Sequence, residues 1–69
     1  MKLSARNTLE GKIIAIKKGP VSTEVTIETE AKEKIVSSIT TTSADNLGLE
    51  VGKTAFAVIK ASNVMVAVE

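Results

Sequence analysis

Apolar and β-branched residues alternate with polar ones along much of the chain, and this period of two indicates half-buried β-strands. The clearest stretch is residues 21–28, whose odd-numbered positions are Val, Thr, Val and Ile, with Ser, Glu and Thr between them. Val, Ile and Thr suit a pleated surface, and they also dominate four further segments. The pattern therefore predicts strands over residues 9–18, 21–28, 34–41, 54–60 and 64–68.

One short segment, residues 43–48, has the composition of a single helical turn. Ser43 is expected to cap its N-terminus, because a serine hydroxyl accepts a hydrogen bond from a free backbone N–H of the first turn. Asp45 is expected within that first turn, where its charge complements the helix dipole. Gly48 follows the segment and is expected to end it.

Two other glycines mark the first strand and the turn after it. Gly19-Pro20 predicts a turn between the first two strands. Gly11 lies inside the first strand, where a glycine indicates a bulge or a close approach of another backbone. Five short strands, with a helical turn between the third and the fourth, predict an all-β fold, a small five-stranded OB-like Greek-key barrel. We expect one domain over residues 1–69.

The first, fourth and fifth strands lack a consistently polar face. Ile13 and Ile14 are adjacent, and residues 55–59 are all apolar. We expect Phe56, the only aromatic residue, to lie in the core. A chain of 69 residues builds a marginal core, and without Cys or His it can form neither a disulfide nor a Cys/His zinc site. A neighbouring subunit is therefore the expected cover for the second apolar face.

The composition also narrows the function. Without His or Cys the chain lacks the commonest general base and the thiol nucleophile, so no enzyme activity is expected. An OB-like nucleic-acid-binding module is the alternative, but the net charge of +1 and the single Phe argue against basic grooves and stacked rings. No apolar run approaches the length of a membrane span and no signal peptide is evident. We expect a cytoplasmic protein with no membrane or nucleic-acid partner.

Hydrogen-bond donors gather at the ends of the predicted elements in three clusters, residues 4–7, 40–43 and 60–63. The clusters contain Ser, Thr, Asn, Arg and Lys and no carboxylate. A fully deprotonated tetrahedral dianion accepts hydrogen bonds and donates none, so its site needs such donors and excludes carboxylates. Arg6 and Lys60 would supply two positive charges. Phosphate or sulfate satisfies much of the same requirement, so this argument leaves the anion open.

The clusters belong to a longer set of segments with a characteristic spacing. The segments are Ser4-Ala5-Arg6-Asn7 followed by Leu9 and Gly11-Lys12, Lys17-Lys18-Gly19, Ile39-Thr40-x-x-Ser43 with Leu47-Gly48-Leu49, and Ala57-x-Ile59-Lys60-Ala61-Ser62-x-Val64. Together they resemble the molybdate-binding Mop domain of the molbindin family, over essentially the whole chain. One departure is Thr8, where the family often has Gln, outside the donor clusters.

The resemblance implies an OB-like barrel that assembles into a homo-oligomer, a hexamer built as a trimer of dimers. It implies intracellular storage or homeostasis of molybdate or tungstate, held at subunit interfaces by hydrogen bonds, without a covalent cofactor or a protein-ligated metal. Two subunits would supply the cations Arg6 and Lys60, the hydroxyls of Ser4, Thr40 and Ser43, and the backbone N–H groups of Ala5 and Ala61. For a second kind of site, near a three-fold axis, the candidates are Asn7, Gly19 and Pro20.

Overall fold

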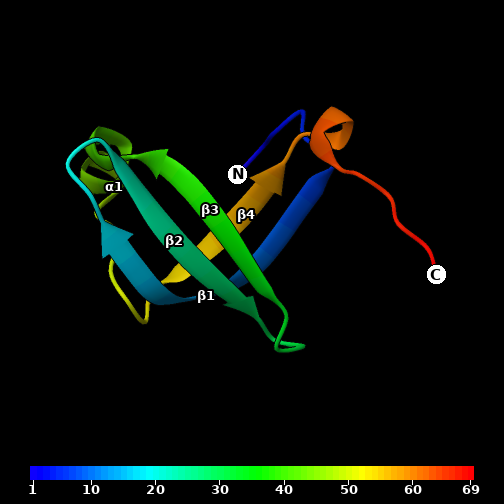
Figure 1. The fold of residues 1–69 in the computed structure, drawn as a ribbon, viewed down its shortest axis with the longest axis horizontal. Coiled ribbons are helices and arrows are strands. Elements are labelled where there is room, and N and C mark those ends of the chain that lie inside the picture. The colour runs from blue at the N-terminus through cyan, green and yellow to red at the C-terminus, as the bar shows by residue number, and fades with distance from the viewer.

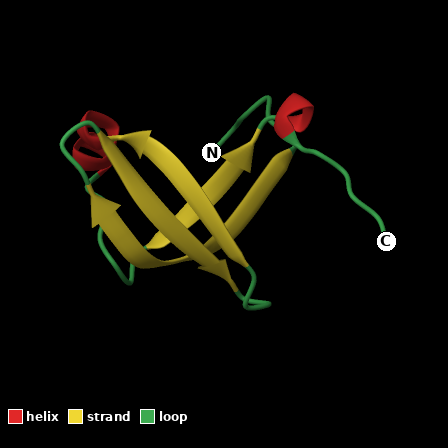
Figure 2. Cartoon of the chain, in the orientation of Figure 1, coloured by secondary structure: helices red, strands yellow, loops and turns green.

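The computed structural model describes all residues from 1 to 69. Its longest strand, β1, lies between two other strands, β2 and β4 (Figure 1). Strands make up most of the regular structure, with one α-helix and one short 3-10 helix (Figure 2). The elements are β1 (Asn7–Lys18), β2 (Ser22–Thr29), β3 (Lys34–Thr40), α1 (Thr41–Leu47), β4 (Thr54–Ile59) and η1 (Ala61–Asn63).

All neighbouring strands pair antiparallel in one sheet of order β3-β2-β1-β4, which is the strand order of a Greek key. β4 pairs with the first half of β1, from Asn7 opposite Ile59 to Lys12 opposite Thr54. β2 pairs with β1 as far as Lys18. The predicted all-β architecture with one short helix is confirmed, and Figure 1 shows the sheet strongly curled.

An irregularity in β1 contributes to this curl. Ile13 pairs with Ile27, and the next paired residue, Ala15, lies opposite Thr26, so that Ile14 has no partner on β2. Such a bulge bends a strand and increases its local twist. It allows β1 to follow β4 at its start and β2 at its end.

Gly11 allows the close approach that its position in the first strand predicts. It is buried, and a Cβ at this position would lie 2.5 Å from the carbonyl O of Glu28 and 2.7 Å from the Cγ2 of Ile27. No side chain fits at such distances unless the backbone of β2 moves. The glycine is therefore required by packing between β1 and β2, while the bulge itself lies further along at Ile14.

The core lies on the inner face of the curled sheet and is small. Its buried apolar side chains come from three strands, with Ile13 on β1, Val25 and Ile27 on β2, and Ala57 on β4. The alternation predicted for residues 21–28 is confirmed from Thr23 onwards, since Thr23, Val25 and Ile27 are all buried and the residues between them are less so. Val21, predicted on the same face, precedes β2 and is exposed. The partly buried side chains that pack against this core are Ile16, Ile35, Ile39, Leu49 and Ala55.

The helix α1 begins earlier than predicted, because its N-cap is Thr40, three residues before Ser43. Thr40 ends β3 in an extended conformation, and its Oγ1 accepts a hydrogen bond from the Ser43 N–H at 3.0 Å. Asp45 consequently lies beyond the first turn of α1, which contains no acidic residue. The prediction that its charge complements the helix dipole from the first turn was therefore wrong. Gly48 ends the helix at φ 61°, as predicted.

Neither helix has the length and apolar character that crossing a membrane requires.

The predicted fifth strand, residues 64–68, is absent, so the sheet has four strands. After η1 the chain runs away from the sheet and ends far from it (Figure 1). Its backbone therefore finds no neighbouring strand, which a β-strand needs for its hydrogen bonds. The apolar side chains of this tail are left in solvent, with Met65, Val66 and Val68 each at least 90% exposed.

Phe56 was predicted in the core but is 46% exposed. Successive side chains of a strand point to opposite faces, and on β4 it is Ala55 and Ala57 that face the core. Phe56 and Val58 consequently share the outer face, where each is nearly half exposed. The apolar outer face of β4 is therefore the second face for which the sequence predicted a partner.

Candidate functional site

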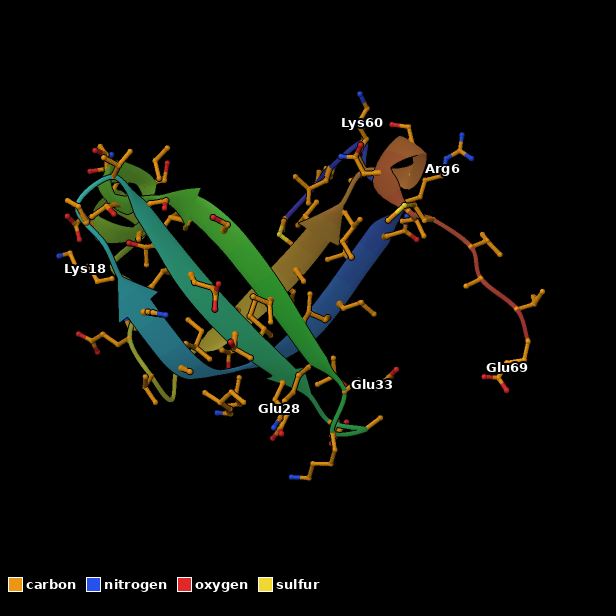
Figure 3. All side chains as sticks on the ribbon, in the orientation of Figure 1. Arg6, Lys18, Glu28, Glu33, Lys60 and Glu69 are labelled. Carbon is orange, nitrogen blue, oxygen red and sulfur yellow. The ribbon has the colours of Figure 1, made fainter.

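Arg6 and Lys60 lie at the same end of the sheet, because β1 and β4 pair in register up to that end. Asn7 is opposite Ile59, and Arg6 and Lys60 are the residues immediately outside that pair. Figure 3 labels both beside η1 and shows their charged groups directed away from the sheet. Two cations from opposite ends of the sequence are thus placed at one end of the molecule.

Neither of these two cations is neutralised within the chain. The structure contains two ion pairs, Lys18 with Asp45 at 3.0 Å and Lys32 with Glu28 at 3.9 Å, and neither involves this end of the sheet. Unpaired positive charges without a carboxylate partner favour an anionic ligand, since charged hydrogen bonds to an oxyanion are stronger than neutral ones.

Neutral donors surround the same two cations. Ala61 begins η1, and the first N–H groups of a helix have no partner inside it. The backbone N–H groups of Ala5 and Ala61 and the hydroxyl of Ser4 make no hydrogen bond within the chain. Five of the seven predicted binding residues therefore lie together as an N-terminal donor group, which consists of Ser4, Ala5, Arg6, Lys60 and Ala61.

The other two predicted residues, Thr40 and Ser43, form a second donor group where β3 passes into α1. The Thr40 hydroxyl donates to the Ser43 Oγ at 2.8 Å and accepts from the Ser43 N–H at 3.0 Å. Both side chains are exposed. The single hydroxyl hydrogen of Thr40 is used in that bond, whereas Ser43 Oγ is the acceptor, so the Ser43 hydroxyl hydrogen is the one available to a ligand.

The two donor groups lie at opposite ends of the sheet. β1 starts beside the N-terminal donor group and ends at Lys18, whose amine pairs with Asp45 of α1. The twelve residues of β1 separate these ends, in a molecule that extends 36 Å along its longest axis. One chain does not bring all seven predicted residues around one small anion, and within the chain they form two separate groups.

The residues predicted for a second kind of site are also separated. Asn7 lies with the N-terminal donor group, where its Nδ2 donates to the carbonyl O of Ile59 at 3.3 Å. Gly19 and Pro20 lie at the far end of β1, in the turn that the Gly19 N–H closes by donating to the Ser22 O at 3.0 Å. The turn is confirmed, whereas within one chain these three residues form no common site.

Two hollows on the surface are lined by polar residues, and neither holds the predicted donors. The larger, of about 430 Å³, includes the carboxylates of Glu10, Glu28 and Glu30, which would repel an oxyanion. The smaller, of about 280 Å³, lies beside the Gly19 turn, with two lysines and one carboxylate among its lining residues, which are Lys17, Lys18, Gly19, Ser22, Glu24 and Ser38. The exposed donors at the ends of the strands remain the better candidates for an anion.

Comparisons with known proteins identify the family of this small β-fold. The family model of the TOBE domain matches residues 3–66. The chain is 45% identical, over the full length of both proteins, to the probable molybdenum-pterin-binding protein of Haemophilus influenzae. The chain therefore belongs to the TOBE domain family.

Solved structures narrow the family further. MopII from Clostridium pasteurianum is 40% identical and superposes with a TM-score of 0.93, covering 97% of this chain and all of MopII. The cytoplasmic molybdate-binding protein ModG, solved with molybdate bound, is 45% identical with a TM-score of 0.90, over 94% of this chain and 46% of ModG. Within the TOBE family the chain is a molbindin, a Mop domain, as its sequence predicts.

Proposed function

We propose that this chain forms a single Mop domain over residues 1–69 that binds molybdate reversibly and without catalysis, with tungstate as a close mimic. The observation that carries the proposal is the N-terminal donor group, where Arg6 and Lys60 lie at the same end of the sheet beside free N–H groups and neither cation pairs with a carboxylate. The names of its relatives support molybdenum as the element, and the molybdate bound to ModG supports the oxyanion form.

The donors favour a fully deprotonated anion. Hydroxyl, ammonium, guanidinium and backbone N–H groups can all donate to molybdate, which carries no proton near neutral pH. Phosphate carries at least one proton there, and a pocket without acceptors leaves that proton unpaired at a cost of about 1–3 kcal/mol. Sulfate has no such proton and must be rejected by size, because a cage spaced for longer metal–oxygen bonds stretches its hydrogen bonds.

The complete site forms between two copies of the chain. One copy contributes its N-terminal donor group and another contributes Thr40 and Ser43, because these groups lie at opposite ends of one sheet. The exposed apolar surfaces support self-association, since Phe56 and Val58 are uncovered and the tail of residues 64–68 extends into solvent. We propose a homo-oligomer, and specifically the hexamer that the resemblance to molbindins implies. A molybdate store or buffer in the cytoplasm is the physiological role that follows.

Titration calorimetry of the purified oligomer with molybdate, tungstate, sulfate and phosphate tests the proposed function. We expect heat of binding with the first two anions, and weaker or no binding with the others. Equal affinity for all four would remove the proposed selectivity, and no binding of molybdate would remove the function. Native mass spectrometry on the same sample reports the number of chains and of bound oxyanions, and a monomer that binds molybdate fully would contradict the shared site.

A further inference from the structure

The three threonines of residues 40–42 have different surroundings, although the sequence does not distinguish them. Thr40 caps α1, and the Thr42 side chain is exposed and makes no hydrogen bond. The Thr41 hydroxyl instead donates to the carbonyl O of Gly19 at 2.6 Å. Thr41 was not among the predicted binding residues. Three identical residues in a row do not indicate which of the three hydroxyls points into the protein.

A second hydroxyl completes this contact. Thr41 Oγ1 lies 2.8 Å from Thr23 Oγ1. Since the single hydroxyl hydrogen of Thr41 is used on Gly19, Thr23 is the donor in this pair. Thr23 is only 1% exposed, so no water competes for its hydroxyl. The result is a short chain of hydrogen bonds from β2 through α1 to the turn, with each hydroxyl satisfied.

The backbone of Thr41 makes a further attachment to the same turn. Its N–H donates to the carbonyl O of Val21 at 2.9 Å, so two carbonyls of the β1–β2 turn are held by one residue. Thr41 thereby joins the first residue of α1 to a turn that is itself closed by the Gly19 N–H. The bond from its hydroxyl is the part of this attachment that a side-chain substitution removes.

Apart from the pairing of Thr40 with Ser22 on β2 and the exposed ion pair between Asp45 and Lys18, the neighbouring donors have few side-chain contacts to hold them in place. Thr40 and Ser43 are exposed, and the only buried residue of α1 is Ala44. A helix of seven residues is too short to be stable by its own hydrogen bonds. We propose that Thr41 is a positioning residue for the oxyanion, which sets the location of the Ser43 hydroxyl and of the Thr40 side chain bonded to it, without contacting the ligand. This inference rests on the proposed function.

The change from Thr41 to Val tests the inference, because valine keeps the shape and removes the hydroxyl. Gly19 O then loses its donor and Thr23 loses its acceptor, so the start of α1 is held to the turn only by the backbone bond from the Thr41 N–H to Val21 O. We expect the affinity for molybdate to fall by about tenfold, equivalent to about 1.4 kcal/mol. Thr41→Ser keeps the hydroxyl and should restore the affinity to within about twofold of the original chain.

Two matched variants separate positioning from stability. Thr42→Val makes the same substitution at an exposed threonine without a hydrogen bond and should leave affinity unchanged. Thr23→Val removes a buried hydroxyl of the same network but leaves the bond from Thr41 to Gly19. It should lower the melting temperature while keeping the affinity within about twofold. If Thr41→Val does not fold, Thr41→Ala removes the hydroxyl without placing a methyl group against the Gly19 carbonyl.

The measurement is titration calorimetry with sodium molybdate on the assembled oligomer, at a temperature where circular dichroism shows each variant folded. A tenfold loss confined to Thr41→Val, with rescue by Thr41→Ser, supports positioning. An unchanged affinity in folded Thr41→Val would overturn it, and so would equal losses in Thr41→Val and Thr23→Val, which would indicate a purely structural role. Failure of the original chain to bind molybdate would instead refute the proposed function.

Discussion

Asn7 and Ile59 face each other across β1 and β4, and the Asn7 amide donates to the Ile59 carbonyl at 3.3 Å. This pair closes the ladder between the two strands at one end of the sheet. The residue on either side of it, Arg6 before and Lys60 after, therefore leaves the sheet at the same place. The proximity of the two cations is a consequence of strand register, and the first predictions depend on it.

Replacing Arg6 by Ala should abolish most molybdate binding and leave the fold intact. Arg6 is exposed and makes no ion pair, so its loss opens no cavity. A hydrogen bond to a charged group contributes about 1.5–3 kcal/mol, so we expect an affinity loss of roughly 10-fold to 100-fold. Lys34→Ala is the matched control, because Lys34 is an exposed cation on β3 that belongs to neither donor group. Calorimetry that finds the two variants equal would exclude a contact from Arg6.

Molybdate should raise the melting temperature of the oligomer. A ligand that binds only the folded state at one hundred times its dissociation constant stabilises it by about 2.7 kcal/mol. For a domain of this size that corresponds to a shift of roughly 10–20 °C. Differential scanning fluorimetry with and without molybdate measures it, with sodium chloride at equal ionic strength as the reference. A shift of the same size in Arg6→Ala would show that the stabilisation does not come from the proposed site.

Replacing Gly11 by Ala should destabilise the fold. The added methyl group would lie 2.5 Å from the Glu28 carbonyl O, so the backbones of β1 and β2 must separate. Overpacking of this kind costs about 1–3 kcal/mol, and chemical denaturation monitored by circular dichroism would measure the loss. The change from Lys12 to Ala, at the adjacent exposed position, should alter stability by no more than about 0.5 kcal/mol. Equal stabilities of the two variants would mean that Gly11 is not constrained by packing.

Removal of residues 64–69 should weaken self-association while the sheet stays folded. No residue of this segment belongs to the buried core or to a strand, so its loss removes no packing within one chain. Exposed apolar side chains such as Val66 and Val68 are instead available to a second copy. Light scattering after size-exclusion chromatography should show a smaller assembly or a higher dissociation constant. An unchanged oligomer would exclude the tail from the interface, and a loss of secondary structure would show that the tail supports its own chain.

Local patterns were sufficient to predict much of the fold. The alternation over residues 21–28 identified β2 and its buried face, and Gly48 identified the end of α1. These features depend on interactions between residues close in sequence, which a pattern of residue types can indicate. The cap was misplaced because Thr40 and Ser43 are both good capping residues, and the choice between them depends on where β3 ends.

The two clearest errors have a common cause. Phe56 and residues 64–68 have the composition of core and strand, yet both are exposed in the folded chain. Apolar and β-branched residues indicate that a segment is suited to burial, but they do not say whether the partner that buries it belongs to the same chain. A strand also needs a neighbour for its backbone hydrogen bonds, and the direction of the chain after η1 decides whether one is within reach.

The sequence by itself determined the fold class, the molbindin family and the kinds of donor that the chain offers, because these follow from residue types and their spacing. Only the tertiary structure decided how the donors are grouped. Register between β1 and β4 brings Arg6 to Lys60, and the length of β1 keeps both away from Thr40 and Ser43. It likewise decided that Thr41 turns inward to Gly19 while its neighbours stay in solvent. Such arrangements arise from contacts between residues far apart in sequence, so they could not be predicted without knowing which strands pair.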